Sequence, residues 1–151
     1  MLKYIKLLIL LTVVIIGSVS CSQSSFKRIS HEEQQKIINQ VKNSKIILLD
    51  VYHNRCESCK LIEPVVKQLK EQYSQNPDIS FLKYDLSNPF TIYDSRKLAK
   101  NLGLEEIYKS QKYSGVILFI DSKTKEVLDT LIGEYNLSKY NEIIEKRLRA
   151  T

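Results

Sequence analysis

The chain has 151 residues, of which 43% are hydrophobic and 26% are charged, and it carries a formal net charge of +6. This length fits one ordinary domain. Only four glycines and three prolines are present, which excludes collagen-like and low-complexity architectures. Three cysteines are too few for a disulfide scaffold and cannot all pair within the chain. At least one cysteine therefore has a role apart from an internal pair.

The first twenty residues have the three parts of an export signal. Lys3 and Lys6 precede an apolar run at residues 7–16, and small residues then lead to Cys21. The run is shorter than the roughly 20 residues that a membrane span needs. We therefore predict a signal peptide over residues 1–20, with a retained membrane anchor as the alternative.

The residues at the expected cleavage point, Gly17-Ser18-Val19-Ser20-Cys21, resemble a bacterial lipobox, although Ser18 stands where that motif usually has leucine. The resemblance implies that cleavage leaves Cys21 at the N-terminus. There it would be lipidated and would anchor the protein at the extracytoplasmic, or periplasmic, face of a bacterial membrane. Residues 21–29 would form a tether. An ordinary cleaved signal that leaves a stray thiol is the alternative.

The mature chain lacks a dense cationic patch. Removal of residues 1–20 takes away two lysines and no acid, which lowers the net charge from +6 to +4. The densest basic stretch, residues 146–149, ends an amphipathic helix, where cations favour the helix dipole. We therefore expect no nucleic-acid partner.

Periodicity and caps predict the elements of a domain over residues 30–151. Ser30 and Glu33 form a capping box, and the helix that follows places Ile38 and Val41 on one face. Residues 104–113 are polar and fit either a short helix or a loop. The remaining elements are strands at 45–52, 79–86, 116–120 and 126–132, and helices at 61–73, 94–102 and 138–148.

The order of these elements predicts an α/β fold. A strand, a helix and a second strand within about forty residues form a right-handed βαβ unit with parallel strands. The last two strands are joined by a turn and form an antiparallel pair. A mixed four-stranded sheet with helices on both sides, in three layers, accommodates this order.

The motif Cys56-Glu57-Ser58-Cys59 carries the chemistry. A zinc ribbon needs a second such pair, and haem attachment needs a histidine after the second cysteine, where this chain has Lys60. A redox pair and a structural disulfide remain. The motif lies between a buried strand and the first turn of a helix, where the dipole favours a thiolate on Cys56 and Cys59 can resolve a mixed disulfide. This position favours the redox pair.

The chain resembles the thioredoxin family over residues 30–149. Asp50 falls where the family has a buried acid beneath the second cysteine, and Pro64 falls on its helix-kinking proline. Lys83 matches the lysine beside that acid, and Gly133 matches a glycine after the last strand. The resemblance implies a thioredoxin-like fold and thiol–disulfide exchange that needs no cofactor.

Four residues receive catalytic roles. Cys56 is the attacking thiolate and Cys59 the resolving thiol. Asp50, with a pKa raised by burial, would move a proton for Cys59, and Lys83 would hold Asp50 partly charged. A strand-capping acid and a solvated edge lysine are the alternatives for the last two.

The chain departs from the family at three places. Glu57-Ser58 is neither the Gly-Pro of reducing members nor the x-His of oxidising members, and Arg55 replaces a tryptophan. Where the family has a cis-proline that shapes substrate docking, this chain has Ser114 and Gly115. We expect these two residues to form the substrate-binding loop.

We predict a membrane-tethered thiol–disulfide oxidoreductase. Its partners would be cysteine-containing exported proteins and a membrane redox protein, because an oxidising compartment requires a donor or an acceptor of electrons. No metal is assigned. One alternative is a copper-handling protein that uses Cys56, Cys59 and His53, and another is a thioredoxin-fold interaction module whose thiols are idle.

Overall fold

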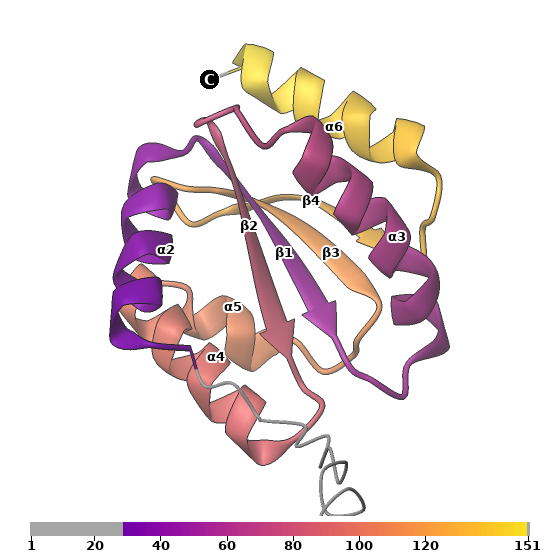
Figure 1. Cartoon of the computed structure of the whole chain (residues 1–151). Coiled ribbons are helices and arrows are strands. Elements are labelled where there is room, and N and C mark those ends of the chain that lie inside the picture. Colours follow the sequence, from indigo (N-terminus) through magenta and orange to yellow (C-terminus); the bar gives the residue numbers. More distant parts are fainter. Residues whose placement is uncertain (1–28, 151) are drawn as a thin grey trace, which may run out of the picture.

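The computed structural model describes residues 29–150 (Figure 1). The predicted signal peptide, Cys21 and most of the predicted tether lie outside this range. Within it, no helix is long and apolar enough to cross a membrane. The helices are α2 (His31–Asn43), α3 (Glu57–Gln72), α4 (Pro89–Leu102), α5 (Glu105–Ser110) and α6 (Leu137–Ala150), and the strands are β1 (Ile46–Tyr52), β2 (Ile79–Asp85), β3 (Val116–Asp121) and β4 (Val127–Ile132).

The four strands form one mixed sheet in the order β2-β1-β3-β4. Strand β1 pairs with β2 in parallel and with β3 antiparallel, and β3 pairs antiparallel with β4. The predicted sheet and its thioredoxin-like topology are therefore confirmed. Strand β1 lies inside the sheet, which explains its nearly continuous apolar sequence.

Helices cover both faces of the sheet, and each face has its own core (Figure 1). Alternate residues of β1 divide between the two cores. Leu49 and Val51 pack with residues of α2, α4 and α5, whereas Ile46 and Leu48 pack with residues of α3 and α6. Asp50 follows the second set, so its carboxyl lies on the face that α3 and α6 cover.

Helix α4 begins earlier than predicted. The sequence prediction placed its start near Asp94, whereas it starts at Pro89. The side chain of Asn88 accepts hydrogen bonds from the N–H groups of Phe90 and Thr91 at 3.0 and 3.1 Å. Asparagine at the N-cap followed by proline strongly favours the start of a helix. This pair lies several residues before the start that the sequence predicts.

Helix α5 occupies part of the segment 104–113 that the sequence left undecided between helix and loop. The buried residue of this helix is Tyr108, which packs in the same core as residues of α2 and α4. The segment after α5 leads directly to β3 and returns the chain to the end of β1, where the cysteine motif lies.

Candidate active site

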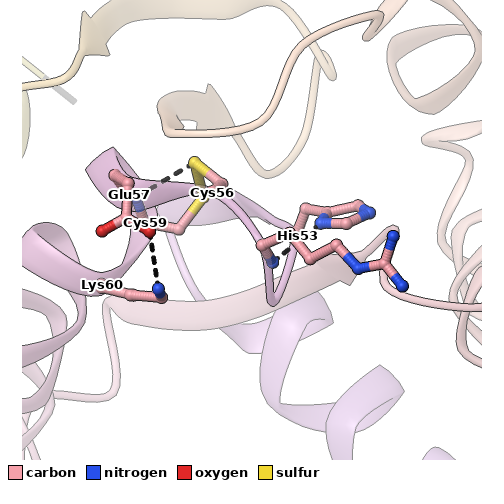
Figure 2. A network of polar contacts seen from close by, with 6 residues as sticks. His53, Cys56, Glu57, Cys59 and Lys60 are labelled. Atoms are coloured by element: carbon pink, nitrogen blue, oxygen red, sulfur yellow. Dashed lines mark hydrogen bonds and ion pairs between the residues drawn. A yellow bond between two sulfur atoms is a disulfide. The ribbon is translucent and has the colours of Figure 1, made fainter.

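The two cysteines lie where β1 leads into α3 (Figure 2). Cys56 is the N-cap of α3, and its sulfur accepts a hydrogen bond from the backbone N–H of Cys59 at 3.1 Å. The two Cα atoms are 5.2 Å apart and the sulfurs form a disulfide. The predicted position of the motif, between a buried strand and the first turn of a helix, is confirmed.

The two sulfurs differ in access to solvent. Cys56 is half-buried, whereas Cys59 is 2% exposed and its sulfur lies 4.0 Å from the carbonyl oxygen of Val51. Another molecule's sulfur must reach the attacking atom, so Cys56 is the member of the pair that can meet a substrate. This asymmetry is what an attacking Cys56 and a resolving Cys59 require.

Asp50 lies on β1, on the face of the sheet that α3 covers. Burial raises the pKa of its carboxyl from 3.8 to about 6, and the charges of Lys83 and Lys70 offset only part of that rise. The increase in pKa predicted from the sequence is therefore confirmed, and the catalytic role of Asp50 stays a prediction. A carboxyl that titrates near pH 6 can take up and release a proton close to neutral pH.

Lys83 faces Asp50 across the β1–β2 pair, at the edge of the sheet. Its side chain is exposed, and its Nζ lies 3.3 Å from the centroid of the Tyr52 ring. Its charge nevertheless lowers the pKa of Asp50. Both sequence interpretations of Lys83 thus hold in part: it is an edge lysine, and it acts on the buried acid.

The chain returns to the disulfide at Ser114 and Gly115, just before β3. No cis peptide bond occurs in the described part of the chain. Gly115 has a φ of 78°, and a Cβ added to it would lie 3.0 Å from the Ser58 Cβ and 3.4 Å from the Cys56 sulfur. Its N–H donates to the carbonyl of Val51 at 2.8 Å. The backbone of the predicted substrate-binding loop therefore passes beside the accessible sulfur, at a position that requires glycine.

Glu57 and Lys60 lie on one side of the disulfide and His53 on the other (Figure 2). The Nζ of Lys60 lies 2.6 Å from a carboxylate oxygen of Glu57, and both side chains are exposed. On the other side, the backbone N–H of Arg55 donates to His53 Nδ1 at 3.0 Å. The ion pair with Lys60 reduces the effect of the Glu57 charge on Cys56.

A copper site would need a third ligand beside the two sulfurs. The Nδ1 of His53 already accepts the hydrogen bond from the Arg55 backbone. Among residues 29–150, no group of three cysteine, histidine or acidic side chains could hold a metal ion. The residues around the disulfide therefore do not fit the three-ligand copper site of the alternative hypothesis.

The family model described as thioredoxin matches residues 25–102, which is more than half of the chain. The chain belongs to the thioredoxin family. The matched part runs to the end of α4 and contains the cysteine motif, Asp50 and Lys83. Helix α5 and the loop at Gly115 lie beyond it.

Individual thioredoxins are similar to shorter parts of the chain. It is 43% identical over 63 residues to thioredoxin F1, chloroplastic, of Arabidopsis thaliana, a match that covers 42% of this chain and 31% of that protein. It is 33% identical over 63 residues to the F-type chloroplastic thioredoxin of Pisum sativum, which covers 42% and 30%. The chain thus spans about a third of these relatives' length. The solved structure of Fasciola hepatica thioredoxin is 21% identical, covers 80% of this chain and 96% of its own, and has a TM-score of 0.48.

Three residues near the buried acid of this thioredoxin-family chain were not singled out from the sequence. Glu63 and Lys70 line, with Asp50, a cavity of about 210 Å³, and Tyr52 lies under the Lys83 ammonium. The spacing of these residues in the sequence could have indicated that they lie near Asp50 or near one another. Glu63 and Lys70 are seven residues apart and share one face of α3, and Tyr52 lies two residues after Asp50, on the same face of β1.

Proposed function

We propose that this thioredoxin-family protein is a thiol–disulfide oxidoreductase that exchanges disulfides with cysteines of exported proteins while Cys21 tethers it to a membrane. The observation that carries the exchange chemistry is the Cys56–Cys59 disulfide at the start of α3, with one sulfur accessible and the other enclosed. The tether and the exported substrates rest on the sequence alone.

The exchange balances in two steps. In the reducing direction, the Cys56 thiolate attacks a substrate disulfide, and one substrate sulfur leaves as a thiolate while a mixed disulfide forms. The Cys59 thiol then loses its proton to the Asp50 carboxylate and attacks the Cys56 sulfur. The second substrate sulfur leaves, two electrons have passed to the substrate, and the Cys56–Cys59 disulfide remains. A membrane redox protein would supply the electrons that reduce it again.

The start of α3 favours the thiolate that this sequence of steps needs. Cys56 lies at the positive end of the helix dipole, and the N–H of Cys59 donates to its sulfur. Both features lower the pKa of a thiol. The carboxylate of Glu57 acts in the opposite sense, but its ion pair with Lys60 weakens that effect. We therefore expect Cys56 to be the more acidic thiol of the reduced protein.

The direction of exchange depends on the reduction potential of the Cys56/Cys59 couple. A value near ~−270 mV is that of a reductant and a value near ~−120 mV that of an oxidant. Glu57 and Asp50 both place negative charge near the sulfurs, and negative charge disfavours thiolates. Because the reduced form carries the thiolate, these acids favour the disulfide and hence a reducing protein.

One experiment that compares the wild type with two variants tests the exchange chemistry and the tether together. The full chain is produced in a bacterium, and membrane and soluble fractions are assayed for reduction of a disulfide-bonded protein with dithiothreitol as the electron source. We expect wild-type activity in the membrane fraction and none with Cys56→Ser. With Cys21→Ser we expect the same activity in the soluble fraction.

Two outcomes separate the parts of the proposal. If wild type is no more active than Cys56→Ser, the exchange chemistry is wrong. If Cys21→Ser stays with the membrane, the lipid tether is wrong, whereas the exchange chemistry still stands. Immunoblots of each fraction provide the control for equal amounts of protein.

A further inference from the structure

A second cavity lies between α4 and α5, away from the cysteines. Its volume is about 590 Å³, within the range of cavities that hold small organic ligands. Helices α4 and α5 cover the sheet face opposite to α3 (Figure 1). The residues that concern its chemistry are Tyr93, Arg96, Lys97, Lys100, Tyr108 and Lys109.

This cavity is separate from the redox site. The sheet lies between it and the face that carries Asp50 and α3. One of its walls is α5, which lies beyond the residues that match the family model. The exchange chemistry at the cysteines therefore does not explain this cavity.

The α4 wall presents cations along a single helical stripe. Tyr93, Arg96, Lys97 and Lys100 follow the spacing i, i+3, i+4 and i+7, which places them on one face. Lys109 on the α5 wall is paired with Glu105 and Glu106. Within residues 29–150, Lys97 and Lys100 have no acidic partner. Glu105 also lines the cavity, but its carboxylate pairs with Lys109. The two exposed ammonium groups of α4 thus border the cavity without a carboxylate paired to them.

Tyr108 forms part of the cavity wall, with its hydroxyl shielded from solvent. Its side chain is 1% exposed, and its hydroxyl has no hydrogen-bond partner in the described part of the chain. Its ring packs on Tyr84 with centroids 4.3 Å apart, and the Tyr84 hydroxyl accepts a hydrogen bond from Arg96 Nε at 3.2 Å. A buried hydroxyl without a partner is costly and uncommon, and such groups often mark a site with a function.

Tyr93 adds a flat apolar surface at the same place. Its side chain is 66% exposed and lines the cavity, one turn before Lys97 on α4. An exposed aromatic ring beside cations is suited to a ligand that combines a planar ring with negative charge, because the ring stacks and the ammonium groups bind the anion.

We propose that the cavity between α4 and α5 binds a small phosphorylated compound with a planar ring. Lys97 and Lys100 contact the phosphate oxygens and Tyr93 stacks on the ring. A phosphate fits better than a single carboxylate because it presents three oxygens and more charge to the two lysines. The proposal is independent of the redox function.

Isothermal titration calorimetry of the full chain at low ionic strength tests the site with four probes. Adenosine monophosphate and phenyl phosphate have both a ring and a phosphate, adenosine has the ring alone, and inorganic phosphate has the anion alone. We expect saturable binding at one site for at least one of the first two, and binding at least about tenfold weaker for the two fragments.

Variants then locate the binding. Lys97→Met/Lys100→Met should weaken it about tenfold or more, and Tyr93→Ala should weaken it several-fold because the stacking surface is lost. The matched control is Lys139→Met/Lys146→Met, which removes the same charge from exposed positions on α6. It should leave the affinity unchanged. The proposal is overturned if neither phosphorylated probe binds, if both cavity variants bind as wild type does, or if the α6 variant loses as much affinity as the α4 variant.

Discussion

Asp50 is a carboxylic acid that the fold holds largely out of water. Its burial could be predicted from the sequence because it interrupts an otherwise apolar strand. The size of the rise in the pKa of Asp50 could not be predicted, because it depends on how strongly the charges of Lys83 and Lys70 lower that pKa. Lys70 comes from α3, and its place beside Asp50 depends on how that helix packs on the sheet.

Replacement of this acid should change how stability depends on pH. The folded pKa of about 6 exceeds the ordinary value of 3.8, so the folded state binds the proton more tightly. The stabilising contribution of the protonated acid is complete below pH 3.8 and is lost as pH rises through about 6. Asp50→Asn should therefore gain stability over wild type as pH rises, by about 2 kcal/mol between about pH 4.5 and about pH 7.5. Urea unfolding of the oxidised proteins measures this gain.

The same variant should exchange disulfides more slowly, because Cys59 loses its proton acceptor. Glu142→Gln, an exposed change on α6, is the charge-matched control for both measurements. A stability difference between Asp50→Asn and wild type that stays constant with pH would contradict the raised pKa. Unchanged exchange kinetics would remove Asp50 from the mechanism but leave its electrostatic effect in place.

Individual elements were predictable to different degrees. Strands β1 and β3 follow directly from apolar runs, and the Ser30 cap of α2 forms as expected, with the Glu33 N–H donating to the serine hydroxyl at 3.1 Å. The sequence does not distinguish helix α5 from a loop because the segment 104–113 is polar, and the helix has only six residues, of which Tyr108 is buried. Its place depends on packing against α4, which periodicity in so short a segment does not encode.

The connection before β3 gives a prediction with an internal control. Gly115 and Gly103 both have positive φ, 78° and 72°, so alanine is strained at either position by about 1–2 kcal/mol. A Cβ at residue 115 would also crowd Ser58 and the Cys56 sulfur, whereas one at residue 103 would lie 3.8 Å from the Lys125 Cε. Gly115→Ala should therefore lose more stability than Gly103→Ala, and it alone should slow exchange.

Thermal unfolding and the rate of substrate reduction measure the two effects separately. Equal stability losses in both variants would mean that the backbone conformation alone accounts for the cost. Equal exchange rates would mean that the space beside the Cys56 sulfur does not limit the approach of a substrate. The presence of serine and glycine at this place was clear from the sequence, but the positive φ and the contact with Ser58 depend on the path of the whole loop.

At the scale of the molecule, the two faces of the sheet differ in how much the sequence reveals. The cysteine motif is contiguous and Asp50 lies on the adjoining strand, so the position of the motif and the burial of Asp50 could be predicted, whereas the catalytic role of Asp50 stays a prediction. The cavity combines lysines of α4 with Tyr108 of α5. In sequence these lysines have the spacing of an ordinary solvated helix face, and only the packing of the two helices places them at a hollow.

The redox state of the pair should alter the stability of the whole domain. A disulfide that closes so short a loop still restricts the unfolded chain, and the chain-entropy relation gives about 2 kcal/mol. The oxidised protein should therefore be the more stable form by about that amount. Folding and reduction form a thermodynamic cycle, in which 30 mV corresponds to about 1.4 kcal/mol. The reduction potential of the Cys56/Cys59 couple is therefore about 40 mV lower in the folded protein than in the unfolded chain. Such a shift makes the folded protein a better reductant.

Urea unfolding of a Cys21→Ser chain, with and without dithiothreitol, measures this difference directly. The triple variant that also carries Cys56→Ser and Cys59→Ser is the control, because dithiothreitol should not change its stability. A reduced form more stable than the oxidised form would reverse the sign of the cycle. In that case the helix dipole and the Cys59 N–H stabilise the Cys56 thiolate strongly. Their effect would outweigh that of Glu57, Asp50 and chain entropy, which favour the disulfide. The protein would then act as an oxidant of its substrates.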